Sequence, residues 1–290
     1  MNTTLSLAVA LVALSPPARV GSQGAVSGTA ASSDGVLLRY DSAGKGDPAL
    51  VFVHCGGCNR GFWDGQMAYF AAKHRVVALD LAGHGQSGKG RKDWTIAAFG
   101  QDVVSVVEAL GLKRVVLIGH SLGGPAVLEA ARRMPGRVAG IVLVDSWVDF
   151  EQRLAAEEVE KYLAALQADY RATTAAITSQ YLFSASTPEP VKARVLETVL
   201  SEPQEIGIAT FRSSAAYDPL PALREIKAPI CAVSSDLFPT NLEGNRKYVP
   251  GYQVAIMKGV GHYLMLEQPE AFNELLAWAL RELARSGGGP

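Results

Sequence analysis

The sequence contains little cysteine: Cys55, Cys58 and Cys231 are the three among 290 residues. Three cysteines are too few for the disulfide framework of a small secreted domain, and none stands with histidines at zinc-site spacing. We therefore predict no metal site. Cys55 and Cys58 form a C-x-x-C pair. We expect both to be unpaired residues that pack in the interior. A local disulfide and a redox centre are the alternatives.

An excess of charge of one sign is also lacking, since the formal net charge is -1. Such a balance gives no electrostatic reason to expect nucleic acid or an anionic membrane as a partner.

Residues 5–14, LSLAVALVAL, are apolar but too few to span a bilayer, so no membrane anchor is predicted. Their length is typical of a signal peptide, although no Lys or Arg precedes them. We expect residues 1–24 to be a leader and the protein to be periplasmic or secreted, or otherwise cytoplasmic. A disordered or core-packed segment is the alternative.

The rest of the chain alternates short apolar runs with helical patterns. Leu50–Val53, Val76–Leu79 and Val115–Ile118 are apolar throughout, as in strands buried on both faces. Ala97–Leu110 has apolar residues at helical spacing before Gly111. Strands alternating with helices predict an α/β fold with a mostly parallel central sheet.

This alternation stops after the apolar run that ends at Asp145. Residues 147–216 instead read as helices rich in Ala, Glu and Leu, and the strand pattern resumes afterwards. We therefore predict a core of residues 25–146 and 217–286, interrupted by a helical cap of residues 147–216.

The segment VVLIGHSLGG, residues 115–124, ends an apolar strand at a serine between glycines. A strand, a G-x-S-x-G turn and a helix form a nucleophile elbow, which exposes Ser121 at the C-terminal edge of the sheet. A serine hydroxyl needs a base, and His262 follows the last predicted strand, so it should reach the same edge. The alternative is a surface serine in an ordinary turn.

A catalytic histidine also needs a carboxylate that orients its ring. Asp236 follows the strand of residues 230–233 and fits the order Ser, acid, His. Asp145 ends the preceding strand and is the competing candidate, whereas Asp218 reads as a turn residue. We predict Asp236 as the acid.

Backbone N–H groups must stabilise the oxyanion of the reaction intermediate. Leu122, directly after the nucleophile, supplies one, and Gly56 in the loop HCGGC is predicted to supply the second, with Cys55 as the alternative. Four residues in loops at or near strand ends are predicted to contact substrate: Phe62, Trp63, Trp147 and Leu237. Cap aromatics are weaker candidates, because at helical spacing they read as cap core: Tyr162, Tyr170, Tyr181, Phe183 and Phe211.

In combination these segments resemble the α/β-hydrolase superfamily, in particular its capped esterases, haloperoxidase-like enzymes and C–C bond hydrolases. The matching stretches are VFVHCGGCNRGFW, VVALDLAGHGQSG, VVLIGHSLGGPAVLEAARRMPGRVAGIVLVD and GVGHYLMLEQPEAF. The chain departs from the family at Cys55, where a glycine usually follows the histidine. The Asp80–Ser87 stretch is a structural loop in the family.

The resemblance implies a serine hydrolase that cleaves a small-molecule carboxylic ester or lactone through an acyl-enzyme, without cofactor. Ser121 in place of an aspartate at the elbow sets the chain apart from dehalogenases and epoxide hydrolases of this fold. The alternatives are a C–C bond hydrolase, amidase or cofactor-free perhydrolase, and a ligand-binding protein without activity.

Overall fold

The computed structural model describes residues 24–287, so nearly all of the predicted leader lies outside the described residues. Its centre is an eight-stranded sheet of order β1-β2-β4-β3-β5-β6-β7-β8. Pairings β1–β2 and β2–β4 are antiparallel, and all the others are parallel. The strands are β1 (Val26–Ala31), β2 (Leu37–Ala43), β3 (Ala49–Val53), β4 (Val76–Leu79), β5 (Val115–His120), β6 (Val138–Val144), β7 (Ile230–Ser235) and β8 (Gln253–Met257). The predicted α/β class is confirmed.

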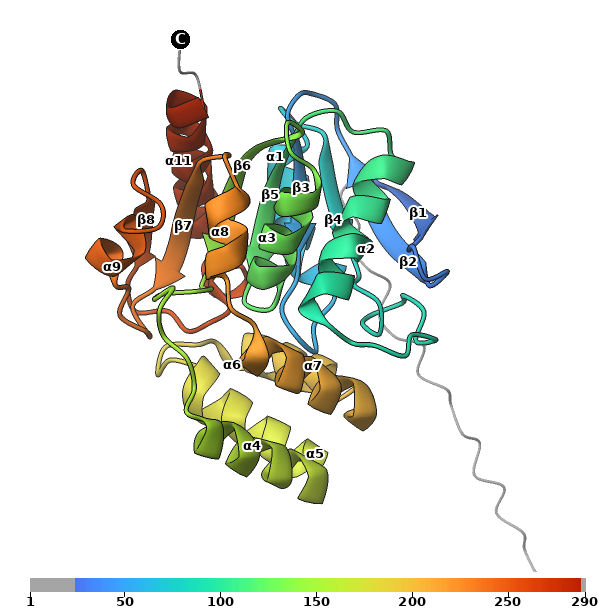
Figure 1. Ribbon diagram of the computed structural model, residues 1–290, viewed down its shortest axis with the longest axis vertical. Helices are drawn as coiled ribbons and strands as arrows, with labels where there is room; N and C mark the ends of the chain where they lie inside the picture. Colours follow the sequence, from blue (N-terminus) through green and yellow to red (C-terminus); the bar gives the residue numbers. More distant parts are fainter. Residues whose placement is uncertain (1–23, 288–290) are drawn as a thin grey trace, which may run out of the picture.

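Helices cover both faces of this sheet (Figure 1). One face carries α1 (Asp64–Phe70) and α11 (Pro269–Gly287), and the other carries α2 (Ile96–Ala109), α3 (Gly123–Arg133) and α8 (Leu220–Glu225). Side chains alternate between the two resulting cores: Val51 packs toward α2 and α3, while Phe52 packs toward α1 and α11. Burial on both faces explains why β3 and β5 consist of continuous apolar runs.

The cap separates β6 from β7 in the sequence, as predicted, and its helices lie beyond one end of the sheet (Figure 1). They are α4 (Ala156–Ala168), α5 (Tyr170–Ile177), a π-helical turn (Thr178–Leu182), α6 (Glu189–Val199) and α7 (Gln204–Ala216). Short elements complete the core: the 3-10 helix Arg60–Trp63, α9 (Leu242–Arg246) and α10 (Leu264–Glu267). The strand ends that bear Ser121 and Asp145 face the cap.

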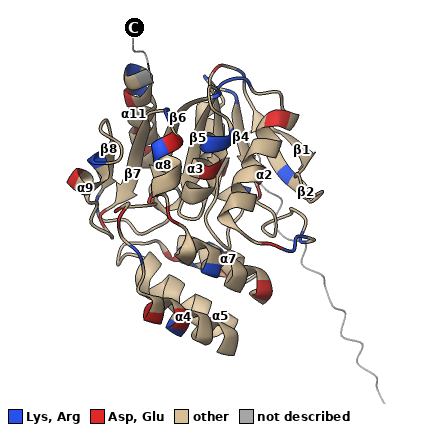
Figure 2. Ribbon diagram, viewed as in Figure 1, with Lys and Arg blue, Asp and Glu red and all other residues tan. Residues whose placement is uncertain are grey.

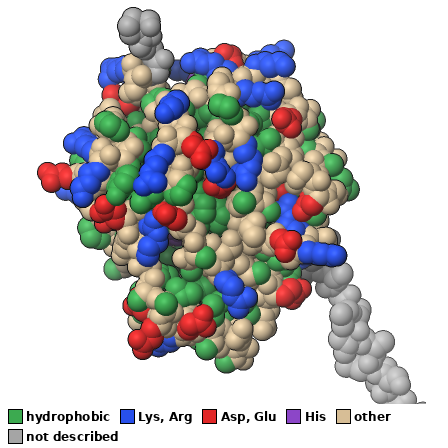
Figure 3. Space-filling view, in the orientation of Figure 1, with side chains coloured by type: hydrophobic (Ala, Val, Ile, Leu, Met, Phe, Trp, Pro, Cys, Tyr) green, Lys and Arg blue, Asp and Glu red, His purple; other side chains and the backbone are tan. Residues whose placement is uncertain are grey.

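Charged residues of both signs are spread over the exposed elements, whereas the interior strands carry almost none (Figure 2). The space-filling view shows hydrophobic side chains gathered in the depression between cap and core (Figure 3). Among residues 24–287, no helix has both the length and the hydropathy that crossing a bilayer requires.

Candidate active site

Ser121 occupies a strained turn between β5 and α3. Its φ angle is 52°, in the left-handed region that side-chain-bearing residues rarely adopt. The Ser121 N–H donates to the carbonyl of Val144 on the neighbouring strand, at 3.1 Å. Glycines make the turn possible, because a Cβ on Gly119 would lie 2.3 Å from the carbonyl oxygen of Gly123. The elbow predicted from the sequence is thus present.

Substituting Gly119 with alanine should therefore destabilise the protein. The added methyl group would meet backbone atoms of Gly123 and Gly124, which cannot rotate away as a side chain could. We expect a loss of about 3 kcal/mol in the free energy of unfolding, measured by urea denaturation. The control is Gly90→Ala, since a Cβ at Gly90 meets nothing within 4 Å. Equal stability of the two variants would contradict this account of the elbow.

His262 lies beside a carboxylate, and that carboxylate belongs to Asp145. The ring Nδ1 of His262 donates to Asp145 Oδ2 at 2.6 Å. Asp145 is itself held from β7, because the Ser235 N–H and hydroxyl donate to its Oδ1 at 2.8 and 2.9 Å. The Asp145 backbone has a φ of 42°, so two of the three site residues sit in strained positions.

The prediction of Asp236 as the partner of His262 is wrong. Asp236 is exposed, and its carboxylate accepts the N–H of Gly259 at 2.9 Å. It follows β7 by one residue, and Ser235 at the end of that strand turns toward Asp145 instead. Asp218, which the sequence indicated as a turn residue, forms an ion pair with Arg153. The available signal was the aspartate that ends the run IVLVD next to the serine strand.

Hydrogen bonds to the backbone hold His262 from two sides. The buried His120 donates from Nε2 to the carbonyl of His262 at 2.8 Å. The N–H of His262 donates to the carbonyl of Leu182 in the cap, also at 2.8 Å. Burial, together with the nearby His262, keeps the pKa of His120 well below its usual value, so this ring is neutral. The loop that carries His262 is thus anchored to both core and cap.

Further contacts join this loop to the cap segment that follows the π-helical turn. The Ser186 hydroxyl donates to the carbonyl of Gly259 at 2.5 Å. The buried carboxylate of Glu267 accepts the Thr187 hydroxyl and the Gly261 N–H, both at 2.9 Å. The His262 loop and this cap segment therefore share one hydrogen-bonded network.

Ser121 and His262 both line a cavity of about 250 Å³ between core and cap. The cap contributes most of its wall, from α4, α5, the π-helical turn and α7. The residues that line it are Cys55, Gly56, Ser121, Leu122, Leu166, Tyr170, Thr174, Ile177, Thr178, Leu182, Glu202, Gly207, Thr210, Phe211, Ser214, His262 and Tyr263. Two of the cap aromatics considered from the sequence, Tyr170 and Phe211, are among them.

None of the four residues predicted to contact substrate lines this cavity. Phe62 and Trp63 are buried, Phe62 beneath the cap against Tyr263 and Trp63 against Phe52 and Phe272. Leu237 is half-buried in the loop after β7, and Trp147 lines a separate hollow. Trp63 does not reach the cavity because the chain turns into α1 directly after it, and the indole is buried in the core.

The two residues predicted to supply oxyanion N–H groups lie next to each other at the cavity. Leu122 and Gly56 both line it, and a Cβ on Gly56 would lie 3.6 Å from Leu122 Cδ2. Cys55 and Cys58 are joined by a disulfide with a Cα–Cα distance of 5.4 Å, so the favoured prediction of unpaired cysteines is wrong. This bond closes the loop that contains Gly56.

A buried acid–histidine pair adjoins the cavity and was not predicted. Glu202 lies 3.0 Å from His84 Nε2 and accepts the Tyr170 hydroxyl at 2.6 Å. The second ring nitrogen of His84 donates to the carbonyl of Ala82, so both nitrogens face oxygen acceptors. Burial alone would lower the pKa of His84, but the Glu202 carboxylate outweighs it and raises that pKa. The cap is thereby tied to the Asp80–Ser87 loop by an ion pair.

The remaining buried histidine, His54, lies at the start of the disulfide loop. Its Nδ1 donates to the carbonyl of Cys55 at 2.7 Å, and its Nε2 accepts the N–H of Leu81 at 3.1 Å. Burial lowers its pKa to about 3, so this ring stays neutral and holds backbone. Within residues 24–287, no cluster of His, Cys, Asp and Glu could hold a metal ion.

Comparisons with known proteins identify the family of the chain. The sequence profile described as "Alpha/beta hydrolase family" matches residues 50–275. A putative carbamate hydrolase, RutD, of Azorhizobium caulinodans is 28% identical over 82% of this chain and 93% of its own. An uncharacterized protein of Mycobacterium tuberculosis is 38% identical, but the match spans only 33% of that relative and 39% of this chain.

Two solved structures show the same architecture. A thermophilic esterase from Thermogutta terrifontis has a TM-score of 0.78 over 89% of this chain and 99% of its own, at 23% identity, a likeness of fold alone. Est816, described as an N-acyl homoserine lactone degrading enzyme, has a TM-score of 0.74 at 29% identity, over 87% of this chain and 99% of its own.

Proposed function

Because the chain belongs to the α/β-hydrolase family, we propose that it is a hydrolase that cleaves carboxylic esters or lactones through an acyl-enzyme on Ser121. The observation behind this proposal is the 2.6 Å contact between His262 and Asp145 at a cavity that also exposes Ser121. A base oriented by a carboxylate, next to a serine on an elbow, is the arrangement that activates a hydroxyl for attack on a carbonyl.

In the first half of the reaction, the Ser121 oxygen attacks the ester carbonyl while its proton passes to Nε2 of His262. Asp145 keeps the other ring proton on Nδ1 and stabilises the imidazolium that forms. The N–H groups of Leu122 and Gly56 stabilise the negative oxygen of the tetrahedral intermediate. The intermediate collapses when His262 returns the proton to the leaving alcohol, and the acyl group remains on Ser121.

In the second half, water replaces the alcohol. His262 takes a proton from the water as its oxygen attacks the acyl carbonyl, and then returns that proton to the Ser121 oxygen as the carboxylic acid departs. A lactone follows the same steps, with the alcohol and acid in one product. The likeness to Est816, an N-acyl homoserine lactone degrading enzyme, supports including lactones in the proposed substrate class.

The proposal is tested by trapping the nucleophile. A fluorophosphonate should label the protein once, and mass spectrometry of the digest should place the adduct on the peptide that contains Ser121. Prior labelling should abolish hydrolysis of p-nitrophenyl acetate, and heat-denatured protein should not be labelled. An adduct on another serine, or full turnover by labelled protein, would refute the proposed mechanism.

A further inference from the structure

One face of α7 passes along two hollows in succession. Gly207, Thr210, Phe211 and Ser214 line the cavity that exposes Ser121, at the spacing that places residues on one helix face. Phe211 and Ser214 also line a second hollow of about 320 Å³, and Ala215 extends the same face into it. A helix rises 1.5 Å per residue, so the stretch from Gly207 to Ala215 is about 12 Å long.

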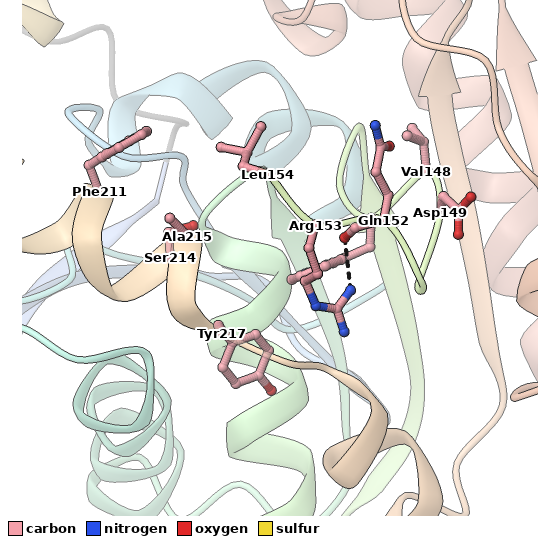
Figure 4. A pocket seen from close by; sticks show the side chains of 10 residues that line it. Val148, Asp149, Gln152, Arg153, Leu154, Phe211, Ser214, Ala215 and Tyr217 are labelled. Carbon is pink, nitrogen blue, oxygen red and sulfur yellow. Dashed lines mark hydrogen bonds between the residues drawn. The ribbon is translucent and has the colours of Figure 1, made fainter. Parts of the chain in front are cut away.

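The opposite wall of the second hollow comes from the segment between β6 and α4. Figure 4 shows Val148, Gln152, Arg153 and Leu154 of this segment across from the end of α7. Trp147 at its start has a φ of 53°, a strained value for a bulky side chain. Its ring lies against two neighbours of the same hollow, with the Arg153 guanidinium carbon 5.4 Å and the Tyr217 ring centre 6.0 Å away.

The charged groups of this hollow are already paired within the protein. Arg153 donates to the carbonyls of Phe150 and Gln152, both at 2.8 Å, and forms an ion pair with Asp218. Asp149 accepts the side-chain amide of Asn241 at 2.9 Å. The rest of the lining is mainly aliphatic and aromatic: Trp147, Val148, Leu154, Phe211, Ala215 and Tyr217. The hollow therefore suits an uncharged, apolar group.

We propose that the second hollow binds the apolar tail of the substrate whose scissile ester lies at Ser121, with the tail passing Phe211 and Ser214 along α7. The inference rests on the proposed esterase function and adds a substrate class, namely neutral esters with an extended apolar chain. The tail belongs to either the acyl or the alcohol part of the ester. Each methylene buried there raises kcat/KM by about fourfold.

Two substrate series test this assignment and identify which part bears the tail. In one, p-nitrophenyl esters run from acetate to decanoate; in the other, alkyl acetates run from methyl to decyl, followed by acid release. In the wild type, kcat/KM should rise with chain length in one series. The variant Ala215→Trp fills the hollow, so it should lower kcat/KM for the longest ester of that series by at least about tenfold. For the shortest ester of each series, p-nitrophenyl acetate and methyl acetate, it should change kcat/KM by less than about twofold, because these esters have no tail that could lose contact.

A matched control lies one residue further along the helix. Ala216 is exposed and does not line the hollow, so Ala216→Trp adds the same side chain outside the proposed site and should leave the length dependence intact. If Ala215→Trp fails to fold, Leu154→Trp tests the opposite wall, because Leu154 is a loop residue that is 46% exposed.

The outcomes distinguish failure of the proposed tail site from failure of the proposed esterase function. Hydrolysis of short esters without a length preference in either series, or identical profiles for Ala215→Trp and Ala216→Trp, would overturn the second site and leave the esterase function standing. Absence of hydrolysis in both series would overturn the proposed function, and the tail site with it.

Discussion

Replacing Ser121 with alanine should lower kcat for p-nitrophenyl acetate by about 10⁶-fold, the loss seen when the nucleophile of a serine hydrolase is removed. The hydroxyl is the group that would form the acyl-enzyme, and alanine leaves no oxygen to take its place. The methyl group of alanine is smaller than the side chain of serine and fits the same strained turn, so the fold should persist. Stopped assays over hours measure the residual rate, and circular dichroism checks the fold.

A serine elsewhere in the same cavity provides the control for this change. Ser214 lines the cavity but belongs to α7 of the cap. Ser214→Ala removes a hydroxyl of the same kind from the cap side of the cavity. It should leave kcat within about threefold of the wild type, since surrounding contacts are unchanged. The role given to Ser121 would be refuted if its alanine variant kept most of the activity.

Replacing Asp145 with asparagine should lower kcat by about 10⁴-fold while KM for the same ester changes little. The side-chain amide can present its N–H to His262 Nδ1, which would force the ring proton onto Nε2, the atom that must accept the Ser121 proton. Donors from Ser235 lie at 2.8 and 2.9 Å from Asp145 Oδ1, so the shape of the site should be retained.

The equivalent change at Asp236 tests whether the loss of activity depends on the carboxylate beside His262, and not on the loss of any one carboxylate. Asp236 is exposed and contacts the Gly259 N–H, so Asp236→Asn should keep kcat within about threefold of the wild type. Steady-state kinetics of both variants from one preparation measure the contrast. If Asp236→Asn were the inactive variant, the carboxylate seen beside His262 would not be the functional one.

The architecture could be predicted from the sequence because local patterns determine it. Continuous apolar runs such as Val115–Ile118 identify strands buried on both faces, and a Gly-Ser-Gly turn after such a run fixes the elbow. His262 could be placed because parallel strands bring the loops after their carboxyl ends to one edge. These inferences need the order of elements along the chain and no contact between side chains.

The acid could not be chosen in the same way, because Asp145 and Asp236 both follow parallel strands at that edge. What separates them is the pair of donors at Ser235, which face Asp145. For Trp63 and the two cysteines, the direction that the chain takes at a turn decides the outcome. Trp63 is turned inward by the start of α1, and Cys55 and Cys58 meet because the chain turns sharply at Gly57, whose φ is 67°.

The hydrogen bond from the His262 N–H to the carbonyl of Leu182 joins the cap to the loop that carries the proposed general base. Moving the cap away at Leu182 would break this bond and leave the His262 ring held by Asp145 alone among its side-chain partners, so cap position and ring alignment are coupled.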